Sequence, residues 1–477
     1  MRKSLLFICS TLLAGLSLPT HAATHPDNED IQRVLTRHQL PADTLALVAL
    51  PLRPGTKAIT YNADAPVNPA SVMKLVTTYA ALDTLGPTYT WKTDLLTDGE
   101  IVGDTLHGNL YFRSGGDPKL TTERLWLLLR DLKLQGVRHI RGNLILDGSY
   151  YDIKNLIAFD GEASDLYRPF MVEPDGLLIN FNAQRFIVRT DRGKAVVVSD
   201  PLVPEVQINN TVQVVPAKAC HTHTRVNFQP RQSEQQLSLP VSGTIPEGCT
   251  SERYFAFIDH TRYSAGVIRS TWDDMGGTLS GKTVLGTTPS SAKLLARLPS
   301  ASVADTIRDI NKFSNNTIAK QLFITLGAHF RTPSDGDDVE SARRSLRNWW
   351  QGLGIQQPSL IIENGSGLSR QERVTARELA LMLQQAANSP YAAEFQASLP
   401  VVGIDGTMRR RLAKHPIAGN ARMKTGTLKN VRAIAGYSKD KNGNDWAVVI
   451  IANHHRNLNN AVLDDLLASL YSQQPVR

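Results

Sequence analysis

A serine and a lysine stand three positions apart, as Ser71 and Lys74, at the start of an apolar segment. The segment continues to Leu85 with apolar residues on nearly every side, which is typical of a helix buried inside a domain, and Gly86 predicts its end. Residues three apart share one face of a helix, so the hydroxyl and the amine are expected one turn apart. A buried lysine loses its proton readily. The pair therefore predicts a nucleophilic serine activated by a lysine base.

The same spacing recurs at two other places in the chain, as Ser290 with Lys293 and as Ser438 with Lys441. The first leads into a short strand-like run, and the second lies in a polar turn. Neither place is expected to offer a helical face. We therefore interpret both as chance matches.

A lysine motif lies on a predicted strand near the C-terminus. Lys424, Thr425 and Gly426 form the only Lys-Thr-Gly of the chain, and Thr427 follows them. A glycine in the middle of a strand usually marks a place where another backbone comes close. The motif therefore predicts that another backbone comes close to this strand.

A third motif, Ser314 and Asn316 as Ser-x-Asn, interrupts a helical pattern. Any one of the three motifs can arise by chance. Their order along the chain is specific, because Ser-x-x-Lys opens a buried helix, Ser-x-Asn lies between helical runs, and Lys-Thr-Gly follows on a strand.

Together these motifs resemble those of the serine penicillin-interacting enzymes, and in particular the low-molecular-mass class C penicillin-binding proteins. Those proteins are D-alanyl-D-alanine carboxypeptidases with endopeptidase activity on peptidoglycan cross-links. The resemblance covers nearly the whole mature chain, including residues 363–370 and 399–406 and a long insertion after the first motif. β-Lactamases place the second motif much sooner, whereas here 243 positions (314 minus 71) separate the two serines.

The resemblance implies an α+β fold with a penicillin-binding, β-lactamase-like transpeptidase domain. An antiparallel sheet flanked by helices is expected, together with a large strand-rich insertion. The expected divisions are a catalytic domain at 23–92 and 298–477, an insertion domain at 93–184 and 255–297, and a nested β-subdomain at 185–254. Within the catalytic domain the sequence pattern predicts strands at 44–52, 58–61, 421–428, 431–437 and 446–453, and helices from 302, 339, 375 and 461.

The resemblance also implies how the reaction proceeds. Ser71 attacks the carbonyl between two D-alanines, and neutral Lys74 takes its proton. The backbone N–H groups of Ser71 and Thr427 hold the oxyanion. Ser314 relays a proton between Lys74 and the leaving amine, and Lys424 and Thr427 receive the terminal carboxylate. This acyl transfer requires no metal or organic cofactor.

Further substrate contacts are implied less directly. Asn316 would hold the peptide amide of the substrate. Asp165, Phe170 and Arg370 match positions that family members use around a diaminopimelate side chain, although an ordinary surface loop is the alternative for this region. Peptidoglycan stem peptides are the expected substrates, and β-lactam antibiotics are expected to act as covalent inhibitors.

The N-terminus has the pattern of a secretory signal peptide over residues 1–22. Arg2 and Lys3 give a positive start, residues 5–18 are apolar, and small residues precede Ala23. We therefore expect a soluble periplasmic protein. Cys220 and Cys249 remain after the signal is removed, and an even count in an oxidising compartment predicts one disulfide, with two free thiols as the alternative.

The composition gives a net charge of +8, and a mature chain without the two basic residues of the signal carries +6. A basic surface favours an anionic neighbour, and an acidic cell wall or a membrane surface fits an exported protein. Export argues against nucleic acid as a partner. The sequence leaves the oligomeric state open.

Two other functions are consistent with some of these features. A β-lactamase or a related serine esterase would share the motifs but needs a fast route for the deacylating water. A non-catalytic wall-binding protein would keep the fold but has no need of a nucleophile. A long-lived penicillin adduct on Ser71 separates the peptidase from the first alternative, and release of D-alanine separates it from the second.

Overall fold

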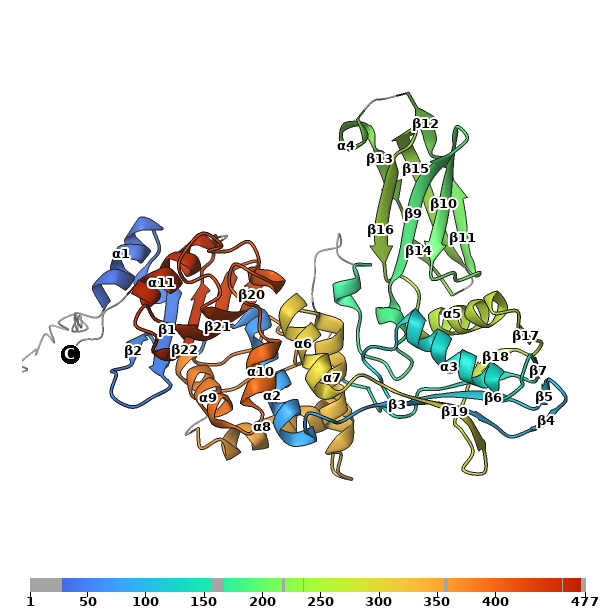
Figure 1. The fold of residues 1–477 in the computed structure, drawn as a ribbon, viewed down its shortest axis with the longest axis horizontal. Coiled ribbons are helices and arrows are strands. Elements are labelled where there is room, and N and C mark those ends of the chain that lie inside the picture. The colour runs from blue at the N-terminus through green and yellow to red at the C-terminus, as the bar shows by residue number, and fades with distance from the viewer. Residues whose placement is uncertain are drawn as a thin grey trace, which may run out of the picture.

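The computed structural model describes residues 28–156, 159, 167–216, 219–234, 236–355, 359–456 and 458–472. The signal peptide predicted over residues 1–22 and the candidate site residue Asp165 lie outside the described residues. The first and last strands of the chain form one sheet, at the left of Figure 1, and the long middle of the chain extends to the other side. No helix in the described residues is both long enough and apolar enough to span a bilayer.

A five-stranded sheet forms the centre of the part of the molecule that is built from the first and last strands of the chain. Its strand order is β2-β1-β22-β21-β20, and every neighbouring pair is antiparallel. β1 therefore lies beside the last strand of the chain, and β20 forms one edge. The strands are β1 (Leu45–Pro51), β2 (Ile59–Tyr61), β20 (Ala421–Leu428), β21 (Val431–Lys439) and β22 (Asp445–Asn453).

Helices cover both faces of this sheet because its strands are apolar on both sides. Leu45 and Leu47 pack with α1 (Glu29–Arg37) and α11 (Ala461–Ser472), whereas Ala46 and Val48 belong to the core on the opposite face. The helices of that second core are α2 (Lys74–Leu85), α6 (Val303–Phe313), α7 (Asn316–His329), α8 (Asp338–Gly352), α9 (Ala376–Asn388) and α10 (Ala392–Ser398). The predicted α+β fold, an antiparallel sheet flanked by helices, is confirmed.

Local signals in the sequence fix where two of these helices begin. The side chain of Ser302 accepts the N–H of Asp305 at the start of α6. Thr375 and Glu378 form a complete capping box at the start of α9. Each cap satisfies backbone donors that the first turn of a helix leaves without a partner.

Two sheets and two helices make up the part of the insertion nearest the catalytic helices. One sheet has the order β18-β8-β6-β3-β19, and the other has the order β17-β7-β5-β4. The elements are β3 (Lys92–Thr97), β4 (Glu100–Val102), β5 (Thr105–His107), β6 (Leu110–Ser114), α3 (Thr122–Leu134), β7 (His139–Arg141), β8 (Leu144–Asp147), α5 (His260–Asp274), β17 (Thr278–Leu279), β18 (Thr283–Leu285) and β19 (Lys293–Pro299).

Residues between β8 and α5 form a second group of strands, which stands upright at the right of Figure 1. One sheet has the order β10-β9-β16, and β15 is the central strand of the other. The elements are β9 (Gln184–Asp191), β10 (Lys194–Asp200), β11 (Val206–Asn210), β12 (Gln213–Val215), α4 (Cys220–His223), β13 (Arg225–Phe228), β14 (Arg231–Gln232), β15 (Leu237–Pro246) and β16 (Thr250–Phe255). Cys220 and Cys249 form the predicted disulfide.

Buried polar contacts join the insertion to the catalytic helices. Lys320 on α7 is 1% exposed, and its Nζ lies 2.7 Å from Glu173 Oε2 of the insertion. The side chain of Gln321 donates to the carbonyl of Asp175 at 2.8 Å and accepts the N–H of the same residue at 3.1 Å. These contacts hold the insertion against the end of α7 that carries the Ser-x-Asn motif.

Candidate active site

Ser71 lies in η3 (Ala70–Met73), a 3-10 turn directly before α2. The sequence predicted Ser71 on the helix itself, but the regular α-helix begins only at Lys74. Ala70 has a φ of 47°, and its N–H is accepted by Asn68 Oδ1 at 2.8 Å. A positive φ costs a residue with a side chain about 1–2 kcal/mol, so surrounding contacts must hold it.

Asn453 on β22 supplies part of that support. Its Oδ1 accepts the N–H of Asn68 at 2.9 Å, and its Nδ2 donates to the carbonyl of Asn68 at 3.0 Å. The turn that carries Ser71 is thereby fixed to the last strand of the sheet.

Lys74 is fully buried, and three oxygens lie within hydrogen-bond distance of its Nζ. Its Nζ lies 2.9 Å from Ser71 Oγ and 2.7 Å from Asn316 Oδ1, and it also contacts the carbonyl of Ser366. Burial lowers the pKa of Lys74 well below the usual lysine value, and the charge of Lys424 lowers this pKa further. The lowered pKa favours the neutral amine of Lys74. This amine lies close enough to Ser71 to take its hydroxyl proton.

Ser314 occupies the junction between α6 and α7. It adopts a left-handed conformation with a φ of 58°, and Asn315 caps α7 by accepting the N–H of Ile318 at 2.9 Å. This geometry explains the interruption of the helical pattern. Ser314 Oγ accepts from Lys424 Nζ at 2.8 Å, so the second motif is joined to the third.

Lys424 and Gly426 face the turn of Ser71 from the edge strand β20. Lys424 is fully buried, and burial lowers its pKa to about 7. A Cβ on Gly426 would lie 2.6 Å from the carbonyl oxygen of Pro69, which confirms the close backbone approach predicted there. The strand edge leaves backbone groups of β20 available to an extended peptide.

The loop from Glu363 to Arg370 covers the turn of Ser71 from another side. Gly367 has a φ of 78°, and a Cβ there would lie 2.0 Å from the carbonyl oxygen of Ala70. The carbonyl of Ser366 accepts from Lys74, as described above, and the carbonyl of Ser369 accepts from Asn68 Nδ2 at 2.9 Å. Only Arg370 of this loop was predicted to have a role, because the carbonyl groups of Ser366 and Ser369 carry no signal of residue type.

Glu372 is a buried carboxyl that sequence analysis missed. Its Oε1 accepts the N–H groups of Glu363 and Asn364 at 3.2 and 3.4 Å, which ties down the start of the loop. Burial raises the pKa of Glu372 to about 7. Its negative charge raises the pKa of Lys74, whereas the charge of Lys320 lowers it.

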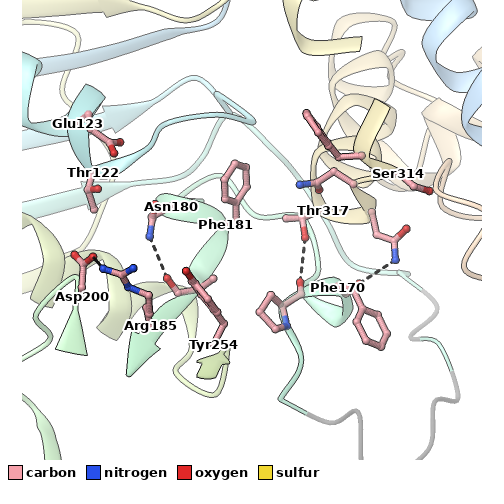
Figure 2. A pocket seen from close by; sticks show the side chains of 15 residues that line it. Thr122, Glu123, Phe170, Asn180, Phe181, Arg185, Asp200, Tyr254, Ser314 and Thr317 are labelled. Carbon is pink, nitrogen blue, oxygen red and sulfur yellow. Dashed lines mark hydrogen bonds and ion pairs between the residues drawn. The ribbon is translucent and has the colours of Figure 1, made fainter. Parts of the chain in front are cut away.

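The remaining residues that were predicted to bind substrate are Phe170, Arg370, Thr425 and Thr427. The carbonyl of Phe170, in η5 (Pro169–Met171), accepts from Asn316 Nδ2 at 3.3 Å (Figure 2). Arg370 lies over the ring of Phe159, 5.4 Å from its centroid. The side chain of Thr425 donates to Thr407 Oγ1 at 2.8 Å, and Thr427 is exposed on the same strand.

The fold and the site define a serine penicillin-interacting enzyme, with a serine and a buried lysine at the reaction centre. Residues 27–473 match the D-Ala-D-Ala carboxypeptidase 3 (S13) family. The chain belongs to this family of serine-type D-Ala-D-Ala carboxypeptidases.

Individual relatives align over most of the chain. D-alanyl-D-alanine carboxypeptidase DacB of Haemophilus influenzae is 27% identical, over 93% of this chain and 91% of the relative. D-alanyl-D-alanine carboxypeptidase of Actinomadura sp. is 26% identical, over 90% and 81%. The crystal structure of penicillin binding protein 4 from H. influenzae has a TM-score of 0.75 at 25% identity, covering 93% of this chain and 99% of its own. That protein complexed with a β-lactam has a TM-score of 0.71.

Proposed function

We propose that this enzyme hydrolyses the bond between D-alanines of peptidoglycan stem peptides through an acyl-enzyme on Ser71. The observation that carries the proposal is the contact of 2.9 Å between Ser71 Oγ and the buried Nζ of Lys74. In the terminal dipeptide and in the cross-link the carbonyl under attack belongs to a D-alanine, and only the leaving amine differs. Both carboxypeptidase and endopeptidase reactions therefore belong to the proposal.

The proposed reaction begins when Ser71 Oγ bonds to the carbonyl carbon and Lys74 takes the hydroxyl proton. The backbone N–H groups of Ser71 and Thr427 stabilise the oxyanion. As the C–N bond breaks, the proton passes to the leaving nitrogen through the hydroxyl of Ser314. Water then attacks the ester carbon and gives a proton to Lys74. The bond between this carbon and Ser71 Oγ breaks, and Lys74 returns the proton to Ser71 Oγ.

The substrate is proposed to lie along the edge strand β20. Lys424, Thr427 and the backbone of the Lys-Thr-Gly motif would receive its terminal carboxylate, and Asn316 would hold its peptide amide. Phe170 and Arg370, with Asp165, remain the proposed neighbours of a diaminopimelate side chain. β-Lactams, whose complex with the H. influenzae relative is known, are proposed to acylate Ser71.

The proposed location is the periplasm. The signal pattern in residues 1–22 supports export, and the disulfide between Cys220 and Cys249 fits an oxidising compartment. Association with an anionic wall or membrane surface would fit the positive net charge.

Digestion of defined wall fragments tests the proposed function. Purified pentapeptide and cross-linked muropeptides are incubated with the enzyme, and mass spectrometry records loss of terminal D-alanine and conversion of dimers to monomers. We expect at least one of these products and a stable adduct with labelled penicillin. Rapid turnover of penicillin without either product would favour a β-lactamase, and the absence of both adduct and product would favour a wall-binding protein.

We expect the efficiency of D-alanine release to fall as the pH rises above about 7, the value to which burial lowers the pKa of Lys424. Lys424 must carry a proton to attract the carboxylate, so kcat/KM should fall about tenfold for each pH unit on the alkaline side. Lys424→Arg keeps its charge throughout this range. The alkaline limb should therefore move upward by about two pH units or more in the variant. If the alkaline fall of kcat/KM occurs at the same pH in Lys424→Arg, a group other than Lys424 causes it.

A further inference from the structure

A groove with a volume of about 710 Å³ lies between the Ser-x-Asn motif and the insertion. One wall is the junction of α6 and α7, which carries Ser314 and Asn316. The opposite wall includes η6 (Asn180–Asn182), Arg185 and Tyr254. Figure 2 shows Ser314 and Thr317 on one side and the ion-paired Arg185 and Asp200 on the other. One end of the groove is therefore lined by two residues whose side chains contact Lys424 and Lys74.

Exposed aromatic side chains gather in this groove. Over the part of the chain that the structure describes, four aromatic side chains are among the exposed large hydrophobic residues: Trp126, Phe170, Tyr254 and Phe313. All except Trp126 line the groove, and their exposed fractions are 40%, 48% and 66% in chain order. Aromatic rings left in water at one place mark a binding surface.

The polar side chains between these rings offer both donors and acceptors. The charged ones are Glu123, Arg185 and Asp200, and Arg185 pairs with Asp200 at 3.2 Å. The lining therefore has no excess of positive charge. Such an excess would be needed to attract a second stem peptide, which is rich in carboxylates. A pyranose ring has an apolar C–H face and a rim of hydroxyl groups, so aromatic faces and mixed polar groups suit a sugar.

The direction of the groove also fits the sugar end of the substrate. Lys424 and Thr427 are proposed to receive the terminal carboxylate on the leaving side, so we place the amide held by Asn316 on the acyl side of the scissile bond. Asn316 Nδ2 donates to the carbonyl of Phe170 at the start of the groove. Four residues separate the scissile bond from the muramyl sugar of a stem peptide. At roughly 3.3–3.6 Å per extended residue, the sugar lies about 13–14 Å from the reacting carbonyl.

We propose that this groove binds the N-acetylmuramyl end of the stem peptide that is being hydrolysed, with Tyr254 as an aromatic surface for the sugar. The proposal rests on the proposed function of the site. It assigns the insertion a part in substrate selection: stems still attached to their glycan are preferred to free peptides. Binding energy from this remote contact raises kcat/KM at the reacting bond.

The test compares D-alanine release from N-acetylglucosaminyl-N-acetylmuramyl pentapeptide with release from the same pentapeptide without sugar. We expect the wild-type kcat/KM to be roughly tenfold higher for the glycopeptide, as loss of one well-placed aromatic contact is worth about this factor. Tyr254→Ala should bring the ratio of the two values close to one. Tyr254→Phe should keep the ratio because it keeps the ring. Trp126→Ala, which removes an exposed aromatic outside the groove, should also keep it.

Equal efficiency on both substrates in the wild type would overturn the sugar site. A proportional fall in kcat/KM for both substrates in Tyr254→Ala would also overturn it. A preference for a sugar-free cross-linked peptide over the glycopeptide would assign the groove to a second stem instead. Failure to release D-alanine from either substrate contradicts the proposed function itself. Release at equal rates contradicts only the sugar site, so the two failures are distinguishable.

Discussion

Ser71→Ala should abolish both D-alanine release and penicillin labelling. The substitution removes the atom that forms the acyl bond, and loss of a serine nucleophile typically lowers kcat by about 10⁶-fold. Ser71 is only partly buried, and its Oγ has one hydrogen bond, from Lys74. The fold should therefore persist. Gel detection of a fluorescent penicillin measures labelling, and circular dichroism during heating measures stability.

Ser290→Ala is the matched control for this experiment. Ser290 also belongs to a Ser-x-x-Lys sequence, but it lies in an exposed turn between β18 and β19. Labelling and turnover should remain at wild-type values. If Ser71→Ala labels normally, or if Ser290→Ala does not, the assignment of the nucleophile is wrong.

Gly367→Ala is expected to have the second large effect. A Cβ at this position would lie 2.0 Å from the carbonyl oxygen of Ala70 and 2.7 Å from the Cα of Ser71. Either the loop or the turn of Ser71 must move. Displacement of a catalytic group by about 1 Å can cost 10²-fold in rate, so we expect the penicillin acylation rate to fall by about that factor or more.

Gly354→Ala separates this collision from backbone strain. Gly354 has a φ of 71°, close to the 78° of Gly367, but a Cβ there meets no atom within 4 Å. Both variants pay about 1–2 kcal/mol for a left-handed residue with a side chain. Only Gly367→Ala should lose acylation, as stopped-flow measurement with a chromogenic β-lactam would record. Similar acylation rates in the two variants would show that the loop does not position Ser71.

The sequence predicted the parts of the fold whose signals are local. Thr375 and Glu378 define a helix start by side chains three residues apart, and β20 to β22 are short apolar strands separated by turns. The helices α1 and α10 were not predicted. They are short, and contacts with distant residues stabilise such helices more than their own propensity does. Ser438 was placed in a turn, but it is buried near the end of β21.

The candidate site could be predicted only where residue type carries the chemistry. Ser71, Lys74, Ser314, Asn316 and Lys424 are recognisable because their side chains are the reactive groups, and the structure brings all five together. The Ser366 carbonyl was not recognisable, since every residue has one. The left-handed conformation of Ala70 was equally hidden, because the turn that contains it is held by Asn453 and Ser369, which are far away in the sequence.

The hydrogen bonds between Asn68 and Asn453 join residues 385 positions apart. At about 5–20 residues per second, a ribosome needs roughly 20–80 s to make the intervening chain. The insertion is complete well before β22 exists, whereas the support of the turn at Ser71 is not. The order of synthesis therefore delays assembly of the reactive serine until nearly the whole protein has been made, and a nascent chain carries an unfinished catalyst.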